Sequence, residues 1–86
     1  MANQDEIQKV WERGKPMPGK DPKLYRQDSM GNKLYRYSYG RSSEMGWEID
    51  HKKPKSKGGS ESIRNKQPLQ TQENRKKSNK YPYKKK

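Results

Sequence analysis

The shortage of apolar side chains limits this chain to one small hydrophobic core. Only 23% of its 86 residues are hydrophobic, 37% are charged, and the formal net charge is +12. A short chain of this composition buries little apolar surface to offset the conformational entropy lost on folding. Low hydrophobicity combined with high net charge is the usual signature of disorder. The composition alone therefore describes a disordered basic polypeptide, and any fold has to come from where the few apolar residues are placed.

Several classes of protein are excluded before any motif is considered. The sequence has no cysteine, which rules out a disulfide framework and a thiolate-bound zinc ion. No apolar run approaches the ~18 residues of a membrane helix, and the first residues lack the pattern of a signal peptide. The absence of cysteine suits a reducing compartment, and we expect a cytoplasmic protein.

The positive charge is concentrated in the second half of the chain. Residues 1–43 contain nine Lys and Arg against five Asp and Glu, whereas residues 44–86 contain thirteen against five. Such a field attracts polyanions, and nucleic acid is the first candidate. An anionic membrane surface is the competing partner, but it requires an amphipathic helix with a broad apolar face, which we do not find. No heptad pattern indicates an oligomer, so we expect a monomer that binds DNA and no membrane.

The N-terminal region predicts a short helix. Ile7, Val10 and Trp11 recur with helical spacing, which indicates an amphipathic helix over roughly residues 4–13, ended by Gly14. Proline and glycine then mark an extended connector.

A hairpin is expected after this connector. Residues 28–32 are a plausible turn, and residues 34–39 are rich in aromatic side chains that favour strands. Tyr35, Tyr37 and Tyr39 alternate along this segment, so they should share one strand face and pack against the helix.

The second half predicts another strand, a loop and a helix. Residues 46–50 alternate as a strand does, Gly58 and Gly59 close a loop, and Thr71 is placed to cap a helix over about residues 71–80. That helix contains no apolar residue, so something other than core burial must hold it. We expect a small core around Trp11, Tyr35, Trp47 and Ile49.

The residues with chemical potential follow the strand at residues 46–50. His51 is the only histidine and comes directly after Asp50, while Asn65 and Asn74 follow 14 and 23 residues later. A lone histidine is usually a surface or structural residue, and single asparagines are ordinary turn and cap residues. Their joint spacing is what makes them candidates for a site, with Lys77 one turn beyond Asn74 on the same helix face.

The stretch from Trp47 to Lys77 resembles the HNH endonuclease family in its His-Asn-Asn form. It follows the family pattern E-[ILV]-D-H-x-x-P-x-S-x-G-G, then N-x-Q-x-L, then N-x-x-K, and covers about 31 of the 86 residues. The residues before it are similar to the lead-in of small stand-alone bacterial or phage HNH proteins. The resemblance implies an α+β fold, the small ββα-metal (His-Me finger) motif, with an N-terminal helix and an extra β-hairpin. We expect a single nuclease domain at 1–80, its metal core at about 45–80, and a basic tail at 81–86.

The resemblance also implies roles for individual residues. His51 would be the general base, since an imidazole with a near-neutral pKa can take a proton from water at working pH. Asp50 and Asn74 would hold one divalent metal ion, and Asn65 would orient the loop that carries His51. Carboxylate and amide oxygens are hard ligands, so Mg²⁺ or Mn²⁺ is favoured, with no structural zinc.

Glu48 matches a family acid that often fixes an arginine near the phosphate. The sequence leaves open whether Arg26, Arg36 or Arg41 is the partner, and whether Glu48 is instead a strand residue that faces solvent.

Basic residues surround the motif and are expected to contact the phosphate backbone. These residues are Lys52, Lys55, Lys57, Arg75, Lys76, Lys77 and Lys80. Two positions depart from the family pattern: Lys52 follows the histidine, where an aliphatic residue is usual, and Lys66 follows the middle asparagine, where leucine is usual. Lysine stems can cover apolar surface, and their charge can equally line a DNA groove, so both interpretations stay open.

The function that this pattern predicts is metal-dependent hydrolysis of DNA phosphodiester bonds, by nicking or by cleavage with weak sequence preference. A small basic domain has little surface for reading base edges, and its charge favours contact with phosphate. The alternative is a basic DNA- or RNA-binding protein that uses the HNH scaffold without cleaving. The joint presence of Asp50, His51 and Asn74 favours the enzyme.

Overall fold

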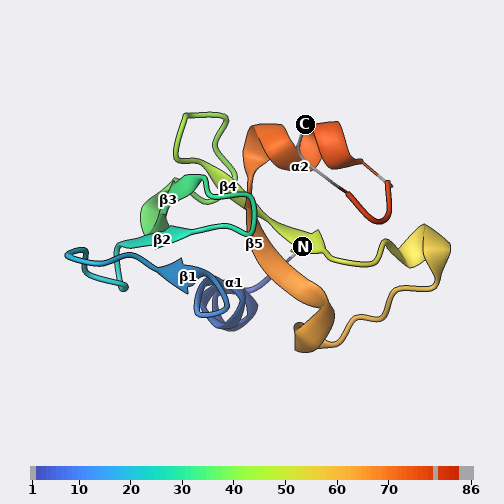
Figure 1. The fold of residues 1–86 in the computed structure, drawn as a ribbon. Helices are drawn as coiled ribbons and strands as arrows, with labels where there is room; N and C mark the ends of the chain where they lie inside the picture. Colours follow the sequence, from blue (N-terminus) through green and yellow to red (C-terminus); the bar gives the residue numbers. More distant parts are fainter. Residues whose placement is uncertain (1, 79, 84–86) are drawn as a thin grey trace.

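The computed structural model describes residues 2–78 and 80–83, which form two short antiparallel sheets and two α-helices (Figure 1). The elements in chain order are α1 (Gln4–Trp11), β1 (Lys15–Pro16), β2 (Tyr25–Gln27), β3 (Lys33–Tyr35), β4 (Trp47–His51), β5 (Lys66–Gln70) and α2 (Thr71–Lys77). Strands β1, β2 and β3 form one sheet, and β4 pairs with β5 in the other. The chain is α+β, as the sequence predicts.

The helix α1 forms where the apolar spacing predicts it, although it is shorter than expected. Asn3 caps its start, because its side-chain oxygen accepts a hydrogen bond from the backbone N–H of Glu6 at 2.9 Å. Ile7, Val10 and Trp11 are its buried residues. The helix ends at Trp11 and not at residue 13, since the next residues close tighter turns through i to i−3 backbone bonds.

The predicted hairpin turn is held by one buried carboxylate. Oδ1 of Asp28 accepts hydrogen bonds from the backbone N–H groups of Met30 at 3.0 Å and Asn32 at 2.8 Å. Gly31 within the turn has a φ of +85°, a conformation that favours glycine. The second oxygen of Asp28 accepts from the backbone N–H of Gln70 at 3.0 Å. The hairpin is therefore attached to the end of β5.

The expectation of a tyrosine-lined strand over residues 34–39 is wrong. Strand β3 ends at Tyr35, and a 3₁₀ turn at Arg36–Ser38 follows, so the alternation of side chains between two faces stops there. Tyr37 is 66% exposed. Tyr35 is only half-buried. The core position that we expected for Tyr35 is taken by its neighbour Leu34.

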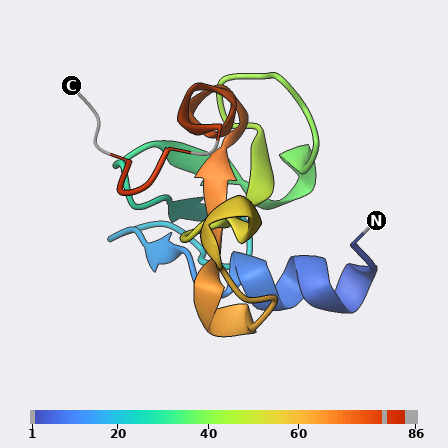
Figure 2. The same cartoon turned by 90° about the vertical axis from the view of Figure 1, so that its right-hand side faces the viewer.

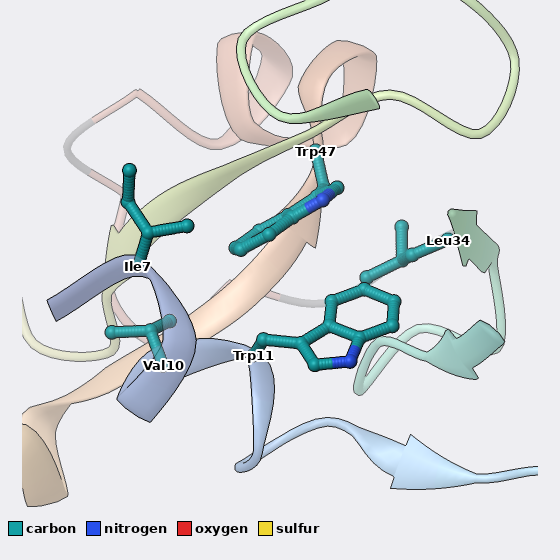
Figure 3. Close-up of a cluster of buried hydrophobic side chains, with 5 residues drawn as sticks. All are labelled: Ile7, Val10, Trp11, Leu34 and Trp47. Atoms are coloured by element: carbon teal, nitrogen blue, oxygen red, sulfur yellow. The ribbon is translucent and has the colours of Figure 1, made fainter. Parts of the chain in front are cut away.

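The hydrophobic core is small and lies between α1 and the two sheets. It consists of Ile7, Val10, Trp11, Leu34 and Trp47 (Figure 3), with Tyr39 and Ile49 packed at its edge. The two tryptophan rings lie with their centroids 5.2 Å apart. The indole N–H of Trp11 donates to the backbone carbonyl of Pro22, and that of Trp47 donates to the backbone carbonyl of Arg36. The core positions of both tryptophans confirm the sequence-based expectation.

Strands β4 and β5 and the helix α2 form a ββα unit. The strands pair from Trp47 opposite Gln70 to His51 opposite Lys66, and α2 follows β5 without a loop. Helices α1 and α2 lie on opposite sides of this hairpin (Figures 1 and 2). The long segment between the two strands includes 3₁₀ turns at Lys55–Lys57 and Ile63–Asn65.

The expected cap of the last helix is not formed by Thr71. This residue is the first of α2, and its hydroxyl donates to the backbone carbonyl of Arg41 at 2.7 Å, which anchors the helix to an upstream loop. The helix ends at Lys77, short of residue 80, because Ser78 adopts a φ of +47°. Within the described ranges, no helix is long and apolar enough to cross a membrane.

Candidate functional site

The amide of Asn65 ties together the segment that joins β4 to β5. Its oxygen accepts from the backbone N–H of Lys53 at 2.9 Å, and its nitrogen donates to the carbonyls of Lys53 at 3.0 Å and Ser60 at 2.8 Å. The backbone carbonyl of Asn65 also accepts from the N–H of Lys52 at 2.7 Å. Asn65 thus holds the chain directly after His51, at the place where the resemblance implies an orienting residue.

A glycine pair allows this segment to fold back on itself. A Cβ atom on Gly59 would lie 1.7 Å from the carbonyl oxygen of Lys53, which no side chain can tolerate, and Gly58 has a φ of +89°. The two glycines that the sequence marks as a loop closure are therefore required by close approach and by backbone conformation.

Asp50, His51 and Asn74 line one pocket of about 280 Å³. Strand β4 supplies the first two residues and α2 supplies the third. The remaining lining residues are Ile49, Pro54, Lys55, Lys77 and Ser78. Three residues that the sequence separates by up to 24 positions are thus brought together where the ββα unit places the end of its first strand beside its helix.

The carboxylate of Asp50 is buried and held on both oxygens. Oδ1 accepts from the ammonium of Lys77 at 2.9 Å, and Oδ2 accepts from the side-chain amide of Gln67 at 2.9 Å. Gln67 lies opposite Asp50 in the strand register, so this contact follows from the pairing of β4 with β5. Lys77 also donates to the backbone carbonyl of His51 at 2.7 Å.

Glu48 pairs with Asn74, and the part of the chain that the structure describes places no arginine in a salt bridge with it. The side-chain nitrogen of Asn74 donates to Oε1 of Glu48 at 3.0 Å. Glu48 is half-buried, so it is not a solvent-facing strand residue, and its bond to Asn74 shows that its side chain reaches α2. Among the described residues Glu48 forms no salt bridge. Its place in the structure is beside the proposed metal ligand Asn74.

His51 has a partner that the sequence analysis does not predict. Its Nε2 lies 3.0 Å from Oε1 of Glu61, which projects from the segment between β4 and β5. Hydrogen bonds from Lys55, His51 and Lys66 lower the pKa of Glu61 from 4.5 to about 2, so this carboxylate is ionised at neutral pH. The sequence does contain an indication that Glu61 has a basic partner, because it is the only acidic residue between Asp50 and Glu73 in a strongly basic stretch.

Lys66 does not line an open groove. It is buried, and its ammonium contacts Oε2 of Glu6 on α1 and, at 3.2 Å, Oε1 of Glu61. The hydrogen bond to Glu6 is the main cause of a raised pKa for Lys66, which keeps it charged. Lys52, the other departure from the family pattern, is exposed.

Six of the seven basic residues predicted to contact phosphate are exposed, and Lys77 is not. The exposed residues are Lys52, Lys55, Lys57, Arg75, Lys76 and Lys80. Lys55 contacts Oε2 of Glu61 at 2.6 Å. Lys77 differs from the expectation because its side chain is turned inward to the pair with Asp50 and is 4% exposed.

The donor atoms in the pocket suit a hard divalent cation. Asp50 offers carboxylate oxygens, and the bond from the Asn74 nitrogen to Glu48 leaves the amide oxygen of Asn74 as its donor atom. Oxygen donors of these two kinds fit Mg²⁺ or Mn²⁺, which keep several waters in their shell. The described residues contain no cluster of three or more His, Cys, Asp or Glu that could hold a metal.

The family model described as HNH endonuclease matches residues 41–83, which is half of the chain. The chain belongs to the HNH endonuclease family. The matched region contains β4, β5 and α2, and with them Asp50, His51, Asn65 and Asn74. The ββα arrangement that the resemblance implies is thus confirmed both by the family and by the structure. Neither a search of the curated proteins nor one of the solved structures found a match.

Proposed function

We propose that this HNH protein is a metal-dependent endonuclease that hydrolyses phosphodiester bonds in DNA. The observation that carries the proposal is the convergence of Asp50, His51 and Asn74 on one pocket beside exposed basic residues. A base, two hard metal ligands and a cationic surface are the parts that phosphodiester hydrolysis requires from a protein.

His51 acts as the general base in this proposal. Its ring lines the pocket and is partly accessible, so a water molecule can approach it. A neutral imidazole accepts a proton at one ring nitrogen, which is the step that a general base performs. Asn65 keeps the following segment in place and so limits the movement of the ring.

Asp50 and Asn74 hold one divalent ion, with Mg²⁺ and Mn²⁺ the favoured choices. When bound, such an ion polarises the scissile phosphate and stabilises the charge that develops on the leaving oxygen. Glu48 serves to orient Asn74, because it holds the amide nitrogen and so presents the oxygen. Gln67 on the neighbouring strand orients Asp50, because its side-chain amide donates to Oδ2 of that carboxylate.

The exposed basic residues provide the binding surface for the DNA backbone. Lys52, Lys55 and Lys57 follow β4 directly, while Arg75 and Lys76 lie on α2 beside Asn74. Contacts of this kind neutralise phosphates irrespective of sequence, so binding should be salt-dependent and weakly selective.

One observation favours the alternative, a DNA- or RNA-binding protein that does not cleave. The ammonium of Lys77 already neutralises Asp50 and competes with a metal ion for Oδ1. A binding protein could retain this internal ion pair as a purely structural element. The two functions differ in a direct way, because only the nuclease requires a divalent ion.

Nicking of supercoiled plasmid separates the two functions. Wild-type protein is incubated with plasmid in Mg²⁺, in Mn²⁺ and in excess EDTA, and binding is followed in parallel by a gel-shift assay. We expect open-circular product in at least one of the two ions, none in EDTA, and binding in all three. Binding without product under either ion would establish the alternative.

A further inference from the structure

The ring of His51 is held at one nitrogen by a carboxylate from another part of the chain. Nε2 lies 3.0 Å from Oε1 of Glu61, ten residues away, and this is the hydrogen bond that the structure gives to the His51 side chain. We propose that Glu61 is a positioning residue for His51: it fixes the proton on Nε2 and leaves Nδ1 as the nitrogen that takes a proton from water. The catalytic meaning of this inference rests on the proposed function.

The tautomer follows from the chemistry of the partner. An ionised carboxylate has only acceptor atoms, so the ring nitrogen beside it has to carry the hydrogen. In a neutral imidazole the other nitrogen is then unprotonated and can act as a base. Glu61 therefore selects one of the two tautomers and fixes the orientation of the ring, which an unpartnered histidine would not have.

Glu61 by itself is poorly placed for such a role, because its side chain is 56% exposed. Two lysines restrain it: Lys55 contacts Oε2 at 2.6 Å, and Lys66 contacts Oε1 at 3.2 Å. Oε1 of Glu61 is thus in contact with both Nε2 of His51 and the ammonium of Lys66. With its charge shared in this way, the carboxylate has few other orientations available.

Lys66 links this arrangement to the N-terminal helix. Its side chain is 10% exposed and also contacts Glu6 of α1, while its backbone carbonyl accepts from Nε of Arg13 at 3.1 Å. A continuous series of contacts therefore runs from Glu6 through Lys66 and Glu61 to His51. An apolar side chain at position 66 could hold neither carboxylate. We infer that the orientation of His51 in this chain depends on α1 as well as on the ββα unit.

The state of the histidine ring can be measured without any substrate. His51 is the only histidine in the sequence, so ¹⁵N-labelled protein gives one pair of imidazole nitrogen signals that needs no assignment by mutation. Spectra are recorded in EDTA at a pH where the ring is neutral, for wild type, Glu61→Ala, Glu61→Gln, Lys66→Leu and Glu44→Ala. Glu44→Ala is the matched control, because it removes the same charge from an exposed position in another loop.

The wild type should show a single tautomer with the hydrogen on Nε2. In Glu61→Ala the two nitrogen shifts should move toward the averaged values of free imidazole, whereas Glu61→Gln, which keeps an acceptor oxygen, should retain most of the preference. Lys66→Leu should move the shifts in the same direction as Glu61→Ala. Unchanged shifts in a folded Glu61→Ala variant, or a wild type with the hydrogen on Nδ1, would overturn the inference.

Cleavage rates distinguish a failure of this inference from a failure of the proposed function. Glu61→Ala should lower kcat by about 10- to 100-fold with KM little changed, and Glu61→Gln should restore much of the loss. A wild-type protein that has a fixed tautomer but does not cleave DNA would refute the proposed nuclease function, but not the positioning of His51 by Glu61. A cleaving wild type whose tautomer and rate survive Glu61→Ala would refute the positioning role but not the nuclease.

Discussion

The ammonium of Lys77 lies 2.9 Å from Oδ1 of Asp50, and both side chains are 4% exposed. The residue proposed to bind a metal ion is therefore already paired with a cation from the same chain. A buried carboxylate without a partner is costly, so this pair allows the fold to form before any metal is bound. It also means that a metal ion has to share Asp50 with Lys77 or displace it.

Replacement of Lys77 by methionine tests this relationship. Loss of the ammonium leaves Asp50 buried without a counter-charge, and we expect the free energy of unfolding in EDTA to fall by about 3 kcal/mol. Mn²⁺ should restore much of the loss, because the ion can neutralise Asp50 in place of the lysine. Thermal unfolding followed by circular dichroism, with and without Mn²⁺, measures both effects. Lys76→Met, at the neighbouring exposed position, is the control; equal stability of the two variants in EDTA would contradict the interpretation.

Substitution of Asn74 should weaken metal binding. Asn74→Ala removes one of the two proposed ligands, and Glu48→Ala removes the residue that holds the amide, so we expect the dissociation constant for Mn²⁺ to rise by about 10-fold or more in each case. Isothermal titration calorimetry with MnCl₂ gives these constants directly. Glu44→Ala, which changes an exposed acid outside the pocket, should bind as wild type does. An unchanged constant in Asn74→Ala would remove Asn74 from the metal site.

Stability at acid pH should depend on Glu61. Hydrogen bonds from Lys55, His51 and Lys66 lower its pKa from 4.5 to about 2. A carboxylate whose pKa is lower in the folded state stabilises the fold above its unfolded pKa, and this contribution is lost as the pH falls from about 4.5 to about 2. Urea unfolding of wild type and Glu61→Gln should therefore differ at pH 6 and converge toward pH 2. A difference that stays constant with pH would rule out the charge of Glu61 as its cause.

The salt dependence of DNA binding should report the phosphate contacts of α2. Arg75 is exposed and follows Asn74 directly, so we expect Arg75→Ala to reduce the slope of log K against log salt concentration by about 1. Fluorescence anisotropy with a labelled duplex at several salt concentrations provides the slope. Lys20→Ala, in the loop between β1 and β2, serves as the comparison, and its slope should match that of wild type. Equal slopes for Arg75→Ala and wild type would show that Arg75 makes no contact with a DNA phosphate.

The sequence predicted the parts of the fold that local pattern determines. The apolar spacing of Ile7, Val10 and Trp11 located α1, and the turn at residues 28–32 located a hairpin. The prediction for the tyrosines at 35, 37 and 39 was wrong. Alternating residues share one face only where the chain is extended, and a 3₁₀ turn at Arg36–Ser38 interrupts the extended chain. That turn is followed by packing of Tyr39 on Trp47, a tertiary contact that no local pattern encodes.

For the candidate site, the proximity of the proposed residues was predictable, and the partners of their side chains were not. Asp50, His51 and Asn74 were found from their spacing, and they do share a pocket. The partners Lys77, Glu48, Gln67 and Glu61 depend on the strand register and on the path of the segment between β4 and β5. Lys77 shows the limit most clearly: helical spacing placed it near Asn74, but only the three-dimensional structure shows that it points to Asp50.

Single-turnover cleavage by wild type and His51→Ala tests the central claim most directly. Both proteins are mixed in excess with a short labelled DNA in Mn²⁺, and binding is measured by anisotropy in the same samples. We expect the wild type to cleave the DNA, and His51→Ala to bind it equally well but cleave it at least about 100-fold more slowly. A wild type that binds without cleaving, or a His51→Ala variant that cleaves at the wild-type rate, would contradict the assignment of His51 as the general base of a nuclease.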